Sequence, residues 1–146
     1  MAVKKVKNPK VPRTRNNFTL TESAFWGFIR STLRNASRWW KPIQQCKLNS
    51  RRAYKGTKKI QKWEYRCNHC KEWFMEKEIQ IDHIVDAGTL TCSNDLPGFV
   101  DRLFCEVEGF QTLCKPCHQV KTNLARKKIN GLYKNIRYLQ NNISVK

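Results

Sequence analysis

The first half of this chain has almost no acidic residues. Residues 1–66 contain 18 of the 29 Lys and Arg residues but only Glu22 and Glu64, a net charge of +16. Residues 67–146 hold 11 basic and nine acidic residues, so the chain's formal charge of +18 lies almost wholly in its first half. Such an excess predicts an anionic polymer as the partner.

The chain also lacks any apolar run long enough to span a bilayer, and no apolar segment follows its basic N-terminus as in a secretory signal. We therefore expect no membrane partner and a reducing, cytoplasmic setting. In that setting paired cysteines indicate metal binding, whereas the alternative is an extracellular disulfide framework. Cys46, Cys92 and Cys105 stand outside the two cysteine pairs.

Those two Cys-x-x-Cys pairs are the most informative motif in the sequence. A two-residue spacer lets one turn present two thiolates to a zinc ion at about 2.3 Å. The pairs predict one closed, structural zinc site whose ligands are Cys67, Cys70, Cys114 and Cys117. A zinc ribbon or treble clef without catalysis would explain the same spacing.

Asp82 and His83 lie between the two pairs, and His118 follows the last cysteine. One carboxylate and one imidazole suit a hard cation such as Mg²⁺ or Mn²⁺ and leave positions open for water and phosphate oxygens. Histidine has an ordinary pKa near 6.5, so a largely neutral His83 could deprotonate a water. Neighbours on a regular strand face opposite sides, so we expect the strand to end or bulge at this step.

The stretches CNHC, IDHIV and LCKPCHQVKT, within residues 63–125, resemble the zinc-supported HNH endonucleases of phages and bacteria. The resemblance implies a ββα-metal core that cleaves double-stranded DNA, encoded by a phage and acting in the bacterial cytoplasm. It implies Asp82 and His118 as ligands of the catalytic ion and His83 as the general base. The family's usual asparagine is replaced by Gly109, which puts the catalytic rate in doubt unless Asn94 or Glu108 takes over.

The predicted fold class is α+β: a ββα-metal core with a four-cysteine zinc knuckle, after a basic, mainly helical region. We expect a disordered arm over 1–17, a helical nucleic-acid-binding region over 18–62, the nuclease core over 63–130 and a C-terminal helix or tail over 131–146. Thr19 or Thr21 should cap a first helix that Pro42 ends or kinks. Strands are expected over 78–85 and 110–113, and helices over 99–105, 117–129 and 133–140, with Gly131 as a stop.

Basic side chains outside the metal sites are the expected DNA contacts, since Lys and Arg bind phosphates without regard to sequence. They are Arg30, Arg34, Arg38, Arg51, Arg52, Lys55, Lys58, Lys59, Lys62 and Lys121. Two other functions stay open: a zinc-stabilised DNA-binding protein with a weakened or lost catalytic centre, and the nuclease subunit of a phage packaging or mobile-element assembly. The sequence does not determine the target site, the oligomeric state, or whether one or both strands are cut.

Overall fold

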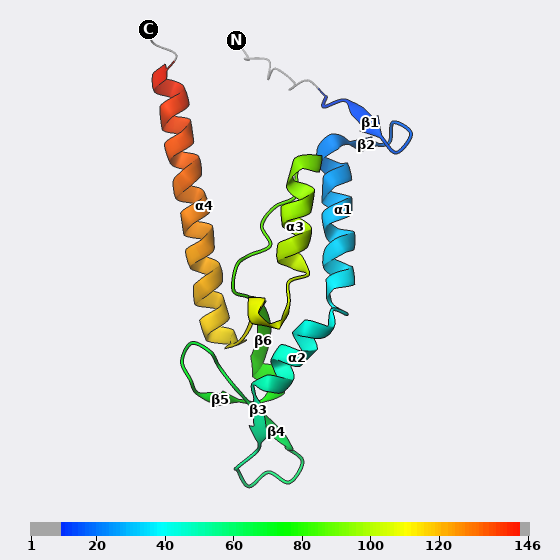
Figure 1. The fold of residues 1–146 in the computed structure, drawn as a ribbon. Helices are drawn as coiled ribbons and strands as arrows, with labels where there is room; N and C mark the ends of the chain where they lie inside the picture. Colours follow the sequence, from blue (N-terminus) through cyan, green and yellow to red (C-terminus); the bar gives the residue numbers. More distant parts are fainter. Residues whose placement is uncertain (1–9, 144–146) are drawn as a thin grey trace, which may run out of the picture. The chain divides into compact units, whose positions relative to one another are not determined.

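The computed structural model describes residues 10–143, with side chains described as far as residue 132. The chain is mixed α/β, with four α-helices and three small antiparallel sheets in this described part (Figure 1). It divides into two compact units, Met1–Trp40 with Val85–Cys105, and Lys41–Ile84 with Glu106–Lys146. The division differs from the expected boundaries because the connection between the two predicted strands folds with the N-terminal helix.

The first unit contains a short hairpin and two helices. Strand β1 (Arg13–Arg15) pairs with β2 (Leu20–Thr21) and leads into α1 (Glu22–Ser37), while η2 (Ser93–Asp95) precedes α3 (Leu96–Leu103). The Thr21 hydroxyl accepts a hydrogen bond from the Ala24 amide at 3.2 Å, so Thr21 caps α1 as one of the two expected residues. Residues 10–17 of the expected disordered arm thus include a strand, and residues 1–9 lie outside the described part.

Helix α1 packs on α3 through an apolar core. The buried members of this core are Trp26, Ala87, Leu90, Phe99 and Leu103. Three partly buried residues of α1, Phe25, Ile29 and Leu33, extend it at the helical spacing seen in the sequence. Residues 85–105 thus form part of this unit, and the helix expected over 99–105 is observed as α3.

The two adjacent tryptophans at the end of this segment have different surroundings. The Trp40 indole N–H donates to the Cys105 carbonyl at 2.7 Å, and its ring meets Phe104 edge-on, so Trp40 is a packing residue. Trp39 is 87% exposed. Helix α1 ends at Ser37, and Pro42 lies in the first turn of a separate helix, as its missing N–H allows.

The second unit begins with α2 (Lys41–Asn49) and a three-stranded sheet. Its strands β3 (Arg51–Ala53), β4 (Trp63–Arg66) and β5 (Trp73–Phe74) pair in that order, all antiparallel. A two-stranded sheet follows after η1 (Glu76–Glu78), formed by β6 (Ile79–His83) and β7 (Phe110–Cys114) with η3 (Val107–Gly109) before β7. The strands expected over 78–85 and 110–113 are confirmed as β6 and β7, whereas β3 lies in the region 18–62 that was expected to be mainly helical.

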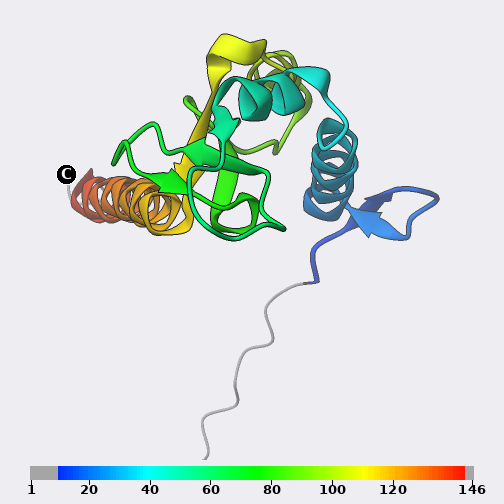
Figure 2. The ribbon, with the colours of Figure 1, turned by 90° about the horizontal axis from the view of Figure 1, so that it is seen from below.

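Helix α4 (Lys115–Ile143) starts directly after β7 and contacts both β6 and β7 (Figures 1 and 2). The two predicted helices, 117–129 and 133–140, are one continuous helix. Gly131 does not stop it: glycine costs only about 1 kcal/mol in a helix interior, and a Cβ there would meet nothing within 4 Å. No described helix combines the length and apolar character needed to cross a membrane.

Candidate metal centres and nucleic-acid interface

The four paired cysteines converge in the second unit, as the spacing predicts. Their Sγ atoms all lie within 4.8 Å of one another, and the Cys70 and Cys114 sulfurs are 3.9 Å apart. Cys67 and Cys70 flank the turn between β4 and β5, Cys114 ends β7, and Cys117 lies in the first turn of α4. Cys67 and Cys114 are buried.

Backbone hydrogen bonds shape the turn that carries the first pair. The Cys67 amide donates to the Glu72 carbonyl at 2.9 Å, and Lys71 adopts a left-handed conformation with φ of 66°. The Asn68 amide donates to the Thr112 carbonyl at 2.7 Å, which ties this turn to β7. The second pair is placed by the junction between β7 and α4, so two separate elements each supply two sulfurs.

The thiols oppose each other's ionisation. Burial raises the pKa of Cys67, but hydrogen bonds from the amides of Cys114, Cys70 and His69 outweigh it and bring that pKa down to about 6. Hydrogen bonding with the Cys114 sulfur, together with burial and the neighbouring Cys67, raises the pKa of Cys117 to about 12. Four ionised thiolates in so small a volume would therefore need a bound cation.

The donor set fits zinc. Four sulfurs about 2.3 Å from a tetrahedral ion are about 3.8 Å apart, close to the separation of the Cys70 and Cys114 sulfurs. The cluster is thus consistent with a structural metal such as zinc. His69 is a neighbour of the cluster, since its Nδ1 lies 3.5 Å from the Cys117 sulfur.

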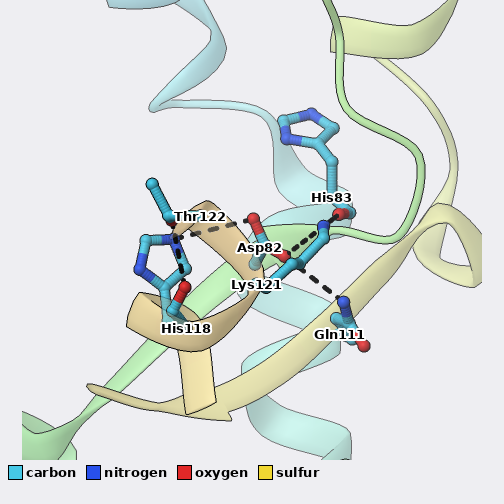
Figure 3. Close-up of polar contacts among 6 residues, drawn as sticks. All are labelled: Asp82, His83, Gln111, His118, Lys121 and Thr122. Carbon is cyan, nitrogen blue, oxygen red and sulfur yellow. Dashed lines mark hydrogen bonds and ion pairs between the residues drawn. The ribbon is translucent and has the colours of Figure 1, made fainter. Parts of the chain in front are cut away.

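A second group of polar side chains lies where β6, β7 and α4 meet (Figure 3). Asp82, on β6, is opposite Gln111 on β7, and His118 lies in the first turn of α4. The His118 Nε2 atom is 3.7 Å from Asp82 Oδ1, and both side chains are mostly buried, at 34% and 14% exposed. Because α4 starts directly after β7, the register of the strand pair determines this approach.

Two further residues hold the other oxygen of Asp82. The Lys121 ammonium lies 2.6 Å from Asp82 Oδ2 and also donates to the His83 carbonyl oxygen. The Gln111 amide donates to Asp82 Oδ2 at 3.3 Å. Lys121 is one turn after His118, and its pairing with Asp82 was not predicted from the sequence. Gln111 was not expected in the site at all, and only the strand register identifies it.

His83 ends β6, opposite Phe110, so the strand stops at the Asp–His step as expected. Its ring lies 4.6 Å from the Phe110 ring, centroid to centroid. In Figure 3 the His83 imidazole points away from the Asp82 carboxylate and the His118 imidazole. The structure therefore brings Asp82 and His118 together and places His83 at the same strand end on another side.

The Asp82–His118 pair can span one divalent ion. Two ligand atoms about 2.1 Å from the same ion are at most about 4.2 Å apart, and 3.7 Å falls within that limit. The same distance is too long for a hydrogen bond. The Lys121 ammonium opposes cation binding, because it already neutralises Asp82. It must move or share the carboxylate for an ion to bind.

Gly109, at the position where HNH endonucleases usually have an asparagine, takes part in a backbone hydrogen bond between the two strand ends. The Ile84 amide donates to the Gly109 carbonyl at 2.8 Å, so the residue after His83 is tied to the residue before β7. Of the two residues suggested as substitutes, Glu108 is exposed and Asn94 belongs to the first unit. A backbone hydrogen bond thus connects the end of β6 to the start of β7.

The expected DNA contacts differ in their exposure and in their partners within the fold. Lys55, Lys58, Lys59 and Lys62 are exposed between β3 and β4. Several arginines are instead engaged within the fold: Arg34 donates to the Gly88 carbonyl at 3.1 Å, and Arg52 pairs with Glu64 at 2.6 Å and covers the Trp73 ring. Arg30 is half-buried, while Arg38 and Arg51 are exposed.

Comparisons with known proteins add no identification. No protein-family model, curated protein or solved structure matches this chain.

Proposed function

We propose that this protein is a metal-dependent HNH-type endonuclease acting on double-stranded DNA. The observation that carries the proposal is the approach of the Asp82 carboxylate and the His118 imidazole to 3.7 Å, beside a four-thiolate cluster. The order of β6, β7 and α4 agrees with the strand–strand–helix core that the sequence resemblance implies. The net charge of +18 supports a polyanionic substrate.

The positions of His83, Asp82 and His118 suggest which residue serves as the base and which hold the metal ion. Phosphodiester hydrolysis by in-line displacement needs the attacking water and the leaving oxygen on opposite sides of the phosphorus. His83 points away from Asp82 and His118, so a phosphate bound at the end of β6 would have the base and the metal ligands on different sides. His83 accepts the proton of the attacking water.

Asp82 and His118 would hold the divalent ion, Mg²⁺ or Mn²⁺, next to the departing 3′ oxygen. When bound, the ion supplies positive charge for the developing negative charge on phosphate and leaving group. Gln111 orients the Asp82 carboxylate through its hydrogen bond. A zinc ion held by the four thiolates would fix the start of α4 and with it His118.

A second candidate function rests on one contact. Lys121 already neutralises Asp82 at 2.6 Å, and the family's asparagine is absent at Gly109. A zinc-stabilised DNA-binding protein that has lost its catalytic ion would retain such an internal pair. This alternative predicts DNA retention without cleavage under any divalent ion.

Supercoiled plasmid separates the two candidates. The zinc-loaded protein should convert plasmid to open circles with Mg²⁺ or Mn²⁺ and not with EDTA. His83→Ala should lower the nicking rate at least ~100-fold, the usual contribution of a general base, while a gel shift shows unchanged DNA binding. Gln80→Ala, an exposed position on the same strand, is the matched control and should nick normally. Full nicking by His83→Ala would refute the assigned base.

A further inference from the structure

The loop between β3 and β4 presents an isoleucine in full solvent among lysines. Ile60 is 97% exposed, the most exposed of the large hydrophobic side chains in the described part of the chain. Residues 51–63 contain no acidic side chain, and Lys55, Lys58, Lys59 and Lys62 around it are all exposed. Burying this apolar side chain against a partner would therefore be favourable.

The loop has a defined shape. The Tyr54 amide donates to the Lys62 carbonyl at 3.0 Å and closes its base next to the β3–β4 pairing. The Gln61 amide donates to the Lys58 carbonyl at 3.1 Å, which makes residues 58–61 a turn. Ile60 is therefore a central residue of this turn, two residues before Lys62.

Two more contacts support the stem of the hairpin. The Tyr54 side chain lies against Gly56 so closely that a Cβ at Gly56 would require the tyrosine ring to move. At the base, the Arg51 guanidinium lies 4.2 Å above the Trp63 ring. The turn is thus joined to a braced stem, and Ile60 is carried by hydrogen-bonded backbone.

We propose that this hairpin inserts into the minor groove of duplex DNA, with Ile60 as a wedge between two base pairs. Proteins that bend DNA from the minor groove insert apolar side chains at a base step, and basic residues beside the wedge hold the phosphates. A tight turn suits a groove about 6 Å wide. The lysines oppose docking of a second copy of this chain, because the copies would meet with like charge.

This inference rests on the DNA binding of the proposed function and adds how the duplex is deformed. Unstacking one step costs a few kcal/mol, which bending repays through extra phosphate contacts. Ile60 should therefore control the bend and the lysines the affinity. Substitutions at the two kinds of residue then have separable effects.

The test uses the zinc-loaded full chain and a short duplex labelled at both ends for energy transfer, without added Mg²⁺ or Mn²⁺. Wild-type protein should shorten the end-to-end distance. Ile60→Ala should lose at least half of that change while Kd and its salt dependence stay within about threefold. Lys58→Ala should weaken binding and reduce the salt slope by about one, with the bend of the complex kept. Leu132→Ala, an apolar residue 62% exposed on α4, should behave as wild type.

Each other outcome overturns a stated part. If wild-type protein does not bind the duplex, the proposed function itself fails. If it binds and Ile60→Ala bends the duplex as wild type does, the wedge is refuted. If sedimentation shows that the free wild-type chain self-associates and the Ile60→Ala variant does not, the turn that carries Ile60 is a protein interface and the inference is wrong.

Discussion

Replacing Cys67 by serine should release the metal from the four-thiolate cluster and unfold the region around it. Cys67 is fully buried, and its sulfur accepts a hydrogen bond from the Cys114 amide at 3.3 Å. Zinc contributes about 10–16 kcal/mol to small zinc domains, so one thiolate of four is worth roughly 3–4 kcal/mol. That loss corresponds to a ~10²- to 10³-fold weaker zinc affinity.

The apolar packing beside the cluster cannot replace this contribution. Its buried core consists of Leu113 with Cys67 and Cys114, joined by partly buried Phe74 and Cys117. A fully buried leucine is worth about 1.5–3 kcal/mol, less than the metal supplies. The turn between β4 and β5 and the start of α4 should therefore lose their structure together when zinc leaves.

Zinc affinity is measured by competition with a chromogenic chelator, and folding by circular dichroism during heating. Cys92→Ser is the matched control, because Cys92 is exposed and outside the cluster. It should keep one zinc per chain and the wild-type melting curve. A wild-type protein that melts at the same temperature before and after zinc is stripped would refute the reasoning.

Two further predictions concern single contacts. Lys121→Met removes the ammonium that competes for Asp82, so in a titration of the zinc-loaded protein Mn²⁺ should bind about 5- to 30-fold more tightly, for about 1–2 kcal/mol of relieved competition. Lys115→Met, at an exposed position on the same helix, should leave the Mn²⁺ affinity unchanged. Weaker Mn²⁺ binding by Lys121→Met would show that the lysine positions the carboxylate instead. Hydrogen bonds from Arg15 and Trp26 lower the pKa of Glu22 to about 2, so its contribution to stability is complete above its ordinary pKa and is lost as pH falls through about 2. The Trp26 indole N–H resonance should shift with a midpoint near that pH, and a midpoint at the ordinary value of a glutamate would contradict the contact.

The sequence predicted the parts of the molecule that are defined by local spacing. Two Cys-x-x-Cys pairs require four nearby sulfurs, and the alternation over 79–83 indicates a strand, because both patterns depend on neighbours along the chain. The cap at Thr21 and the first helix follow from equally local rules. The sequence resemblance supplied the expected roles of Asp82 and His118.

What escaped prediction depends on pairing between distant segments. Gln111 reaches Asp82 only through the register of β6 and β7, and Lys121 reaches it only through the direction of α4. Residues 51–62 were expected within a mainly helical region, yet they contain β3, which pairs with β4 and places Arg52 opposite Glu64. The hydrogen bond from Arg34 to the Gly88 carbonyl likewise joins distant segments, and the role of Arg34 in DNA binding stays a prediction.

The central claim is that Asp82 and His118 hold a hard divalent ion that is distinct from the zinc. Titrating Mn²⁺ into the zinc-loaded protein, with free Mn²⁺ followed by electron paramagnetic resonance, tests this most directly. We expect one Mn²⁺ per chain for the wild type and none for Asp82→Ala or His118→Ala, each with its zinc retained. Equal Mn²⁺ binding by the wild type and both variants, or none by the wild type even with DNA present, would contradict the account.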